Sequence, residues 1–427
     1  MSTPQPFAAW VGIDWADEQH AVCLLAEGSP RAEHRQVAQQ AEALDAWAAE
    51  LHQRFDGRPL AVCLEQSRGA LIYALMKYKF LVLFPLNPKQ LAKYRQAFSP
   101  SGAKDDPQDA ELLCRFVREH HGQLRAWRAD DACTRQLRLL CEDRRRWVAQ
   151  RTALGNQLLQ RLKETFPWAL KFQGREVHGQ AFLRWLAKFP THSELRRASP
   201  KQLERYLPKR RRVPDDPDTF APWVAEIRAA LPLVTDEAVL AAARLAIVSL
   251  VRGLEQLNAI IAQYDQQIAQ VMAQHPDAAL FHSLPGAGAA LAPRLAAALG
   301  TDRGRFRSAA DLQQFSGIAP ITVRSGKSCQ VRRRRACPHF LRQTFHEFAR
   351  CSLMASPWAA AYCRMLRAKG HAFHAAVRSL AYKWLRIIFR CWQDRKPYDE
   401  QRYLNQLQQK SSPLLAYLPP NPSLTEP

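Results

Sequence analysis

A long apolar seam in the middle of the chain constrains the fold more than any other feature. Its members are spaced alternately by three and four positions: Ile247, Leu250, Leu254, Leu257, Ile261, Tyr264, Ile268 and Val271. This heptad spacing favours a coiled coil over an ordinary globular helix. A second helical stripe runs through residues 130–170, where Arg144 and Arg151 interrupt it. The two helices could pair with each other or with another subunit, and the pattern is compatible with both.

The segment between these helices differs from them in composition. Residues 171–235 are rich in proline and charge and include the basic run 209–212. We therefore expect a coiled-coil region over 126–275 that carries a basic insert at its tip. The run 209–212 is equally compatible with a solvated loop and with a nucleic-acid patch. Residues 276–400 predict a mostly helical domain, and residues 401–427, which are proline-rich from Ser411 on, predict a disordered tail.

The first part of the chain predicts an α/β domain. Short apolar runs at 9–14, 21–26, 60–64 and 80–84 are typical of buried strands, whereas 39–55 and 69–78 have helical spacing. The polar residues between the first two runs suit a hairpin. Strands that alternate with helices after a hairpin indicate a mixed sheet covered by helices. The expected fold class is thus α/β for residues 1–125, followed by an α-helical remainder.

The balance of charge indicates the kind of partner. The chain carries 61 lysine and arginine residues against 39 aspartate and glutamate residues, a formal net charge of +22. Such an excess implies an acidic polymer, most simply nucleic acid. No apolar run approaches the length of a membrane span, no signal peptide is evident, and the 10 cysteines stand singly. We therefore expect a cytoplasmic protein without a membrane partner.

Four acidic residues of the first domain are candidates for a metal site. Asp14 closes the first apolar run and Glu65 follows the run 60–64, so both stand at strand ends. Asp106 and Asp109 are three apart at the start of a predicted helix and would share a face, as Asp105 and Asp109 would. Converging carboxylates suit a hard divalent cation, Mg²⁺ or alternatively Mn²⁺. Taken alone, an aspartate at a helix start is more simply a cap.

Two glycines in the last third of the chain suggest contact with phosphate. The segment LPGAG at 284–288 resembles a helix-hairpin-helix loop, in which glycines such as Gly286 and Gly288 let backbone amides approach a phosphate. An ordinary glycine-rich connection between helices is the alternative.

A serine further along is a candidate nucleophile. Ser325 stands beside Gly326, between Arg324 and Lys327, whose charges would suit a scissile phosphate. A serine hydroxyl needs a base or a metal for activation, and by spacing alone Ser325 is a turn residue no better than Ser316 or Ser328. The full set of expected nucleic-acid contacts is Arg144, Arg145, Arg151, Gly286, Gly288, Arg324, Lys327, Arg332, Arg333, Arg334 and Arg335.

In their order along the chain, these motifs resemble the transposases of the insertion-sequence "one-ten" group. The match rests on VGIDWA around Asp14, CLEQS around Glu65, SGAKDDPQDA around Asp106 and Asp109, LPGAG, FSGIAP followed by Ser325, and the stretch KGH…KPYD at 369–399. It covers nearly all of the chain apart from 171–235 and the tail. Asp105 departs from the family, which usually has threonine there.

The resemblance implies a fold and a chemistry. Residues 1–125 would form an RNase-H-like, RuvC-like DEDD domain with Asp14, Glu65, Asp106 and Asp109 at a Mg²⁺ site. Residues 276–400 would form a serine transposase domain in which Ser325 attacks DNA and becomes a phosphoserine. The resemblance further implies a structured noncoding guide RNA, assembly as dimers or tetramers with active sites shared between subunits, and a place at the bacterial nucleoid.

Two other functions compete with this interpretation. A metal-dependent nuclease or junction resolvase would use the same acids with water as the nucleophile. A catalytically inactive nucleic-acid-binding protein would need neither the acids nor Ser325. The intact acidic set argues against the second alternative.

Overall fold

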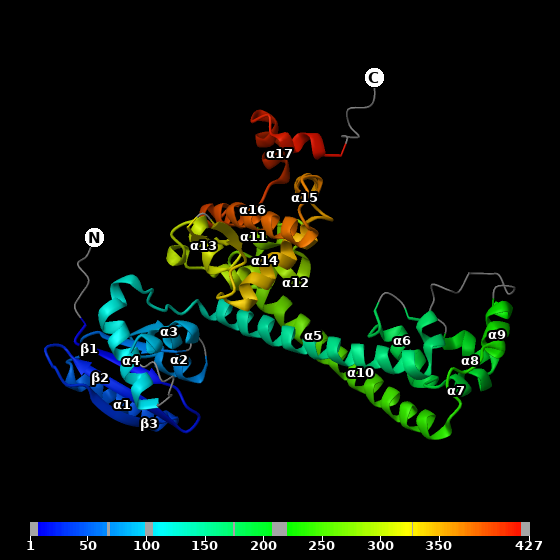
Figure 1. Ribbon diagram of the computed structural model, residues 1–427, viewed down its shortest axis with the longest axis horizontal. Helices are drawn as coiled ribbons and strands as arrows, with labels where there is room; N and C mark the ends of the chain where they lie inside the picture. The colour runs from blue at the N-terminus through cyan, green and yellow to red at the C-terminus, as the bar shows by residue number, and fades with distance from the viewer. Residues whose placement is uncertain are drawn as a thin grey trace. The chain divides into compact units, whose positions relative to one another are not determined.

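The computed structural model describes residues 7–65, 69–98, 106–173, 176–206, 220–326 and 328–419. The chain divides into two compact units, residues 1–130 and 131–427 (Figure 1). Among the described residues, none of the helices combines the length and the apolar character needed to cross a bilayer.

The first unit is built on one mixed five-stranded sheet. Its strands, in the order β3-β2-β1-β4-β5 across the sheet, are β3 (Glu33–Ala38), β2 (Gln19–Ala26), β1 (Ala9–Asp14), β4 (Leu60–Leu64) and β5 (Leu81–Pro85). The three strands β1 to β3 pair antiparallel, whereas β4 and β5 continue the sheet parallel to β1. The predicted hairpin and mixed sheet are therefore confirmed, and β3 is an addition to them.

Helices cover both faces of this sheet. On one face, α1 (Ala41–Arg54) and α2 (Ala70–Leu75) bury Trp47 and Ile72 against Val11, Val22 and Val62. On the other face, α4 (Asp106–His120) buries Leu113 and Val117 against Ala61 and Cys63. The helix α3 (Pro88–Phe98) packs beside α4, which ends in the short 3-10 helix His121–Gln123 (Figure 1).

The contact between α4 and β1 depends on Gly12. A Cβ atom on Gly12 would lie 2.0 Å from the carbonyl oxygen of Ala110 and 2.4 Å from the backbone nitrogen of Cys114, so the backbone of α4 occupies the space of a side chain. A glycine inside a strand commonly marks such a close approach.

We expect Gly12→Ala to destabilise the first unit by about 3 kcal/mol, because helix and strand must separate to admit the methyl group. Chemical denaturation measures this loss. Gly122→Ala is the matched control, since a Cβ atom at Gly122 meets nothing within 4 Å. Equal stability of the two variants would show that α4 does not rest on β1 in this way.

Two long helices form the backbone of the second unit. The helices α5 (Ala132–Thr165) and α10 (Glu237–Ala273) run antiparallel to each other: the thiol of Cys133 contacts the carbonyl oxygen of Val271, and Leu158 shares a core with Ile247. The apolar seam predicted for 247–271 thus faces α5 of the same chain. Of the two pairings that the sequence allowed, the structure contains the one within the chain.

The arginines that interrupt the stripe of α5 have partners on α10. Arg144 forms an ion pair with Asp265, with 3.1 Å between Nη2 and Oδ2, and Arg151 donates to Oδ1 of Asn258 at 3.1 Å. Burial lowers the pKa of the Arg151 guanidinium. These two polar pairs explain why arginine stands at positions where the repeat calls for apolar residues.

The segment expected as a basic insert contains a small helical core. The short helices α6 (Gln180–Lys188), α7 (His192–Arg197), α8 (Pro200–Tyr206) and α9 (Phe220–Ala229), with the 3-10 helix Pro167–Lys171, surround Trp185. Phe172 stacks on Trp185 with 4.3 Å between ring centroids. The basic run 209–212 lies outside the described residues.

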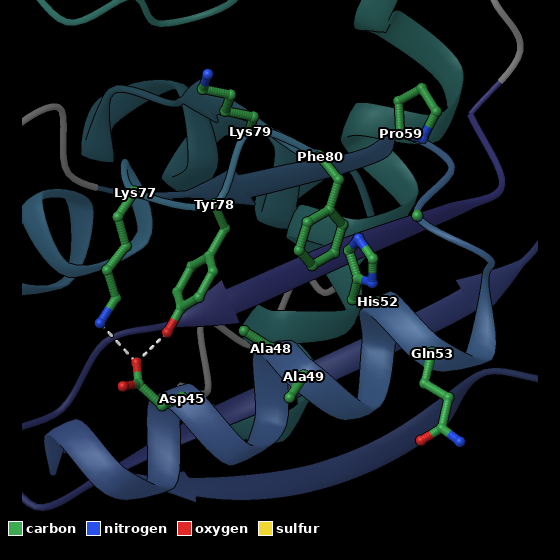
Figure 2. A pocket seen from close by; sticks show the side chains of 11 residues that line it. Asp45, Ala48, Ala49, His52, Gln53, Pro59, Lys77, Tyr78, Lys79 and Phe80 are labelled. Atoms are coloured by element: carbon green, nitrogen blue, oxygen red, sulfur yellow. Dashed lines mark hydrogen bonds and ion pairs between the residues drawn. The ribbon is translucent and has the colours of Figure 1, made fainter.

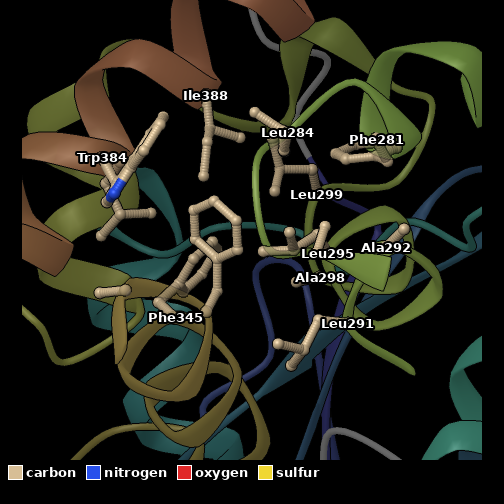
Figure 3. Close-up of a cluster of buried hydrophobic side chains, with 14 of the residues drawn as sticks. Phe281, Leu284, Leu291, Ala292, Leu295, Ala298, Leu299, Phe345, Trp384 and Ile388 are labelled. Carbon is tan, nitrogen blue, oxygen red and sulfur yellow. The ribbon is translucent and has the colours of Figure 1, made fainter. Parts of the chain in front are cut away.

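The remaining helices of the second unit enclose its largest core. They are α11 (Ala278–His282), α12 (Gly288–Leu299), α13 (Ala309–Phe315), α14 (His339–Ser352), α15 (Pro357–Ala368), α16 (Phe373–Asp394) and α17 (Glu400–Gln409). Figure 3 shows Phe345, Trp384 and Ile388 facing leucines of α12 in this core. The 3-10 helix Arg303–Arg305 and a two-stranded ribbon, β6 (Ile321–Ser325) and β7 (Ser328–Arg332), complete the unit.

The expectation of a disordered tail from residue 401 is wrong for residues 401–419. Asp399 caps α17, and the 3-10 helix Pro413–Tyr417 follows it. Leu407 and Leu414 are buried in the core of the second unit, and their apolar side chains tie the segment down.

Two buried histidines make stability depend on pH. In His20, Nδ1 accepts from the backbone N–H of Ala16 and Nε2 faces Oε1 of Gln39, a pattern that only a neutral imidazole satisfies. In His275, Nδ1 likewise accepts from the backbone of Asp277 while Nε2 faces the hydroxyl of Thr134. Burial lowers the pKa of both rings.

We expect the stability of both units to fall as the pH drops below about 6.5, the pKa of an unperturbed histidine. Below this pH the unfolded chain binds protons at its histidines, whereas the two buried histidines of the folded chain stay neutral. Their contribution to the free energy of unfolding is therefore fully present above that pH and is lost as the pH falls below it. Urea denaturation at pH 7.5 and 5.5 measures the change, and His275→Gln removes part of it. Equal midpoints at the two pH values would contradict this account.

Candidate functional site

The sheet brings two of the candidate acids to one edge. Asp14 is the last residue of β1 and is 5% exposed, and half-buried Glu65 directly follows β4. Because Ile13 and Leu64 are neighbours in the parallel pair β1–β4, Asp14 and Glu65 leave the sheet side by side at its carboxyl edge. This is the edge where open α/β sheets place their functional groups.

The first turn of α4 brings the third and fourth acids toward the same edge. Ala110 lies against Gly12, two residues before Asp14 on the same face of β1, so Asp109 belongs to the turn beside that strand end. Asp106 begins the helix and is exposed. The alternative ligand Asp105 lies outside the described residues.

An arginine forms an ion pair with the most buried of these carboxylates. Asp109 is 1% exposed, and the guanidinium of Arg95 on α3 binds it through two hydrogen bonds, Nε to Oδ1 at 2.7 Å and Nη2 to Oδ2 at 2.5 Å. Bidentate pairs of this kind are the strongest that arginine makes. Within the described ranges, no three histidine, cysteine, aspartate or glutamate side chains form a metal-binding group. The elements that carry the acids therefore meet, but the side chains do not form a ligand set.

The candidate nucleophile stands at the tip of the ribbon β6–β7. Ser325 is the last residue of β6 and pairs with Ser328, the first of β7, across a turn in which Gly326 has a φ of 53°. Every residue of the ribbon is exposed except half-buried Ile321. None of the hydrogen bonds found among the described residues involves the hydroxyl of Ser325. The described part of the second unit thus presents this serine to solvent with no hydrogen-bonded base beside it.

The structure argues against one of the two alternative serine nucleophiles. Ser316 is fully buried and its hydroxyl donates to the carbonyl oxygen of Gln313 at 3.1 Å, so it is unavailable to a substrate. Ser328 is exposed like Ser325.

The expected nucleic-acid contacts fall into two groups. Arg324, Arg332, Arg333 and Arg335 are exposed on or after the ribbon, Arg334 is half-buried, and Lys327 lies outside the described residues. By contrast, Arg144 and Arg151 bind α10, and Arg145 donates to Gln343 of α14 at 3.3 Å. These last three arginines hold the second unit together.

The two glycines of LPGAG have different environments. A Cβ atom on Gly286 would lie 2.7 Å from the carbonyl oxygen of Cys351, so this glycine admits the end of α14. Gly288, with a φ of 52°, begins α12 and has nothing within 4 Å of its Cβ position. Only Gly288 therefore leaves room for a ligand at the loop.

The net positive charge of the chain lies in its second unit. Residues 1–130 carry 15 lysine and arginine residues against 16 aspartate and glutamate residues, so their balance is 15 − 16, or −1. Residues 131–427 carry 46 against 23, so theirs is 46 − 23, or +23. The unit that carries the serine therefore attracts a polyanion. The unit that carries the acids has no net positive charge to attract phosphate.

A groove on the first unit lies away from the acids. It is an open groove of about 1000 Å³ between α1 and the residues that lead into β5. Figure 2 shows Asp45 binding Lys77 and Tyr78 at one side of it and His52 against Phe80 at the other. Pro59 and Phe80 precede β4 and β5, so the groove is at the amino ends of strands whose carboxyl ends meet the acidic edge. Asp45, Lys77 and Tyr78 thus bind one another within the groove.

Comparison with known proteins identifies the family. A family model described as "Transposase" matches residues 11–167, and one described as "Transposase IS116/IS110/IS902 family" matches residues 278–364. The chain is 30% identical over 407 residues to a mini-circle protein of Streptomyces coelicolor named as a transposase for IS117, covering 92% of this chain and 95% of that protein. The chain belongs to the IS110 family of transposases.

Two further relatives carry the names of insertion elements. The 42 kDa protein of insertion element IS900 from Mycobacterium paratuberculosis is 25% identical over 91% of this chain and 96% of its own length. The 43.6 kDa protein of IS110 from Streptomyces coelicolor is 25% identical over 70% of this chain and 73% of its own length. As a transposase, the chain acts on DNA, and the match to a DEDD domain fits use of a divalent metal.

Proposed function

We propose that this transposase cuts and rejoins DNA through a covalent bond to Ser325, with a divalent ion held by Asp14, Glu65, Asp106 and Asp109. The observation that carries the proposal is the division of the chemistry: acids at one sheet edge in a unit of nearly zero net charge, and, on a basic unit, an exposed serine with no hydrogen-bonded base among the described residues. The unit that carries the acids does not carry the serine, and the unit that carries the serine does not carry the acids. The metal-binding edge would supply the activation that a serine hydroxyl needs.

The donor set suits Mg²⁺, with Mn²⁺ as the alternative. Carboxylate oxygens are the ligands that these hard cations prefer, and Asp14 and Glu65 leave adjacent strands together. The ion pair between the Arg95 guanidinium and Asp109 supports a preference for positive charge at this carboxylate. Bound there, a divalent ion would neutralise charge on the phosphate during transfer.

The serine would act by in-line displacement. Its Oγ attacks the phosphorus of a phosphodiester, the proton passes to a base at the acidic edge, and the bond from phosphorus to the leaving sugar oxygen breaks. The strand is then held as a phosphoserine ester, so attack by another sugar hydroxyl can rejoin DNA without ATP. Arg324 and Lys327 beside Ser325 would bind the non-bridging oxygens.

The resemblance to the family extends the proposal to partners. A structured guide RNA would select target and donor DNA by base pairing, and the protein would contact backbones through Arg332 to Arg335 and the amide near Gly288. Dimers or tetramers on the bacterial nucleoid would join the acidic domain of one subunit to the serine domain of another. The charge of residues 131–427 supports nucleic-acid binding by that unit.

Cleavage of DNA that bears the element's junction tests the proposal. The full-length protein is mixed with this DNA and RNA transcribed from the element's noncoding flank, with Mg²⁺ or with a chelator. We expect a protein–DNA species that survives SDS with Mg²⁺ and none with the chelator. Nicked DNA free of protein would favour the water-using nuclease, and binding without cleavage would favour an inactive binding protein.

Arg95 gives this metal site a measurable signature. We expect Arg95→Gln to bind Mn²⁺ more tightly than the wild type, because the cation that competes for Asp109 is gone. Without metal the same variant should lose about 3 kcal/mol of stability, since a buried carboxylate is left unpaired. Titration calorimetry measures the affinity and denaturation the stability. Lys93→Gln, an exposed neighbour on α3, is the control. Weaker Mn²⁺ binding in Arg95→Gln would mean that Arg95 supports the metal site.

A further inference from the structure

Two helices of the second unit carry facing rows of basic and imidazole side chains. Along α14, Arg342, His346 and Arg350 follow one another at intervals of four, and His374 and Arg378 do the same at the start of α16. The rows meet at the histidines: the rings of His346 and His374 stack with 5.7 Å between centroids and 27° between planes. His374 and Arg350 are exposed, and His346 and Arg378 half-buried. None of these residues belongs to the ribbon that carries Ser325.

The positive charge at these rows is not neutralised from within. Among the described residues, Arg350 and Arg378 form no ion pair with a carboxylate, and Arg333 and Arg378 add positive charge at His346. Arg342 donates to the carbonyl oxygen of Arg334 and to the thiol of Cys337. The acid that faces His346 is Glu347, which already accepts from Gln343 at 2.6 Å and from Arg294. These positive charges would repel a metal cation, whereas a bound anion would neutralise them.

His346, which stacks on His374, couples such an anion to protons. Burial, His374 and Arg378 together lower the pKa of His346, so its ring is neutral at neutral pH. A phosphate between the rows would favour the protonated ring, since an opposite charge stabilises the imidazolium.

We infer that His346, Arg350, His374 and Arg378 form a binding site for the phosphodiester backbone of nucleic acid, which takes up protons when it is occupied. The inference rests on the proposed action on nucleic acid and adds a site that contacts the backbone away from Ser325. DNA and RNA share this phosphate chemistry, and the two are separated by experiment.

Binding of the full-length protein to two probes tests the site. Fluorescence anisotropy is measured at pH 6.0 and 8.0 with a labelled DNA duplex and with a labelled RNA hairpin of equal charge. For whichever of the two probes binds at this site, we expect the wild-type affinity to rise about fivefold or more at pH 6.0, because an imidazolium strengthens phosphate contacts. The double variant His346→Gln with His374→Gln should lose most of this rise, and Arg378→Gln should weaken binding at both pH values.

Matched controls separate the site from general charge. His371→Gln removes an exposed histidine just before α16 and should keep the full pH dependence. Thermal unfolding of each variant confirms that it is folded. An undiminished pH dependence in the double variant would overturn the site while leaving the proposed function intact. Failure of the wild type to bind either probe would overturn both.

Discussion

Replacing Ser325 by alanine is expected to abolish the covalent protein–DNA species and to lower strand cleavage by a factor of at least about 1000, since the proposed mechanism makes its hydroxyl the attacking group. The variant should fold normally, because Ser325 is exposed and its hydroxyl makes no hydrogen bond among the described residues. A gel of 5′- and 3′-labelled DNA reports both adduct and cleavage.

Ser328→Ala is the matched control for this experiment. Ser328 pairs with Ser325 in the ribbon and is equally exposed, so its loss reproduces any general effect on the tip. We expect Ser328→Ala to retain most of the activity. If Ser325→Ala cleaved at the wild-type rate, the nucleophile would be water or another residue, and the nuclease alternative would be favoured.

Asp14→Asn should be the second variant with an effect of at least about 1000-fold on cleavage. Asparagine keeps the shape of the side chain and removes the charge that a divalent ion requires. Asp14 is buried at the carboxyl edge of the sheet, where solvent would not readily replace the proposed metal ligand. Nucleic-acid binding should be unchanged, since the positive charge belongs to residues 131–427.

Two measurements separate these effects in Asp14→Asn. Calorimetry should show reduced Mn²⁺ binding, while anisotropy shows normal affinity for DNA. Asp17→Asn, in the exposed loop that follows β1, controls for a simple change of charge near the site. Normal cleavage by Asp14→Asn would exclude this carboxylate from the chemistry.

Some elements were predictable because burial leaves a pattern. The run 60–64 is apolar throughout and the run 9–14 is apolar up to its closing Asp14, and they coincide with β4 and β1. The seam of α10 was visible for the same reason. In contrast, β3 has the sequence EHRQVA with four exposed residues, and the ribbon β6–β7 is exposed almost throughout, so neither has an apolar period to detect.

The site was predictable only in part. The strand ends and the helix start pointed to Asp14, Glu65, Asp106 and Asp109, and the elements that carry them do meet. Arg95 could not be found from the sequence, because α3 gives no sign that its arginine faces a carboxylate 14 positions away. Gly12 could have been found, since a glycine in a buried strand signals a close approach. Which glycine of LPGAG is free depends on α14, which no local pattern reveals.

Mass spectrometry of the covalent species tests the central claim most directly. Wild-type protein is reacted with junction DNA, RNA and Mg²⁺, the adduct is isolated in SDS, and nuclease and protease reduce it to a peptide with a nucleotide remnant. The account predicts that the peptide containing Ser325 carries the phosphodiester remnant on that serine. A remnant on another residue, or cleaved DNA with no peptide attached, would contradict it.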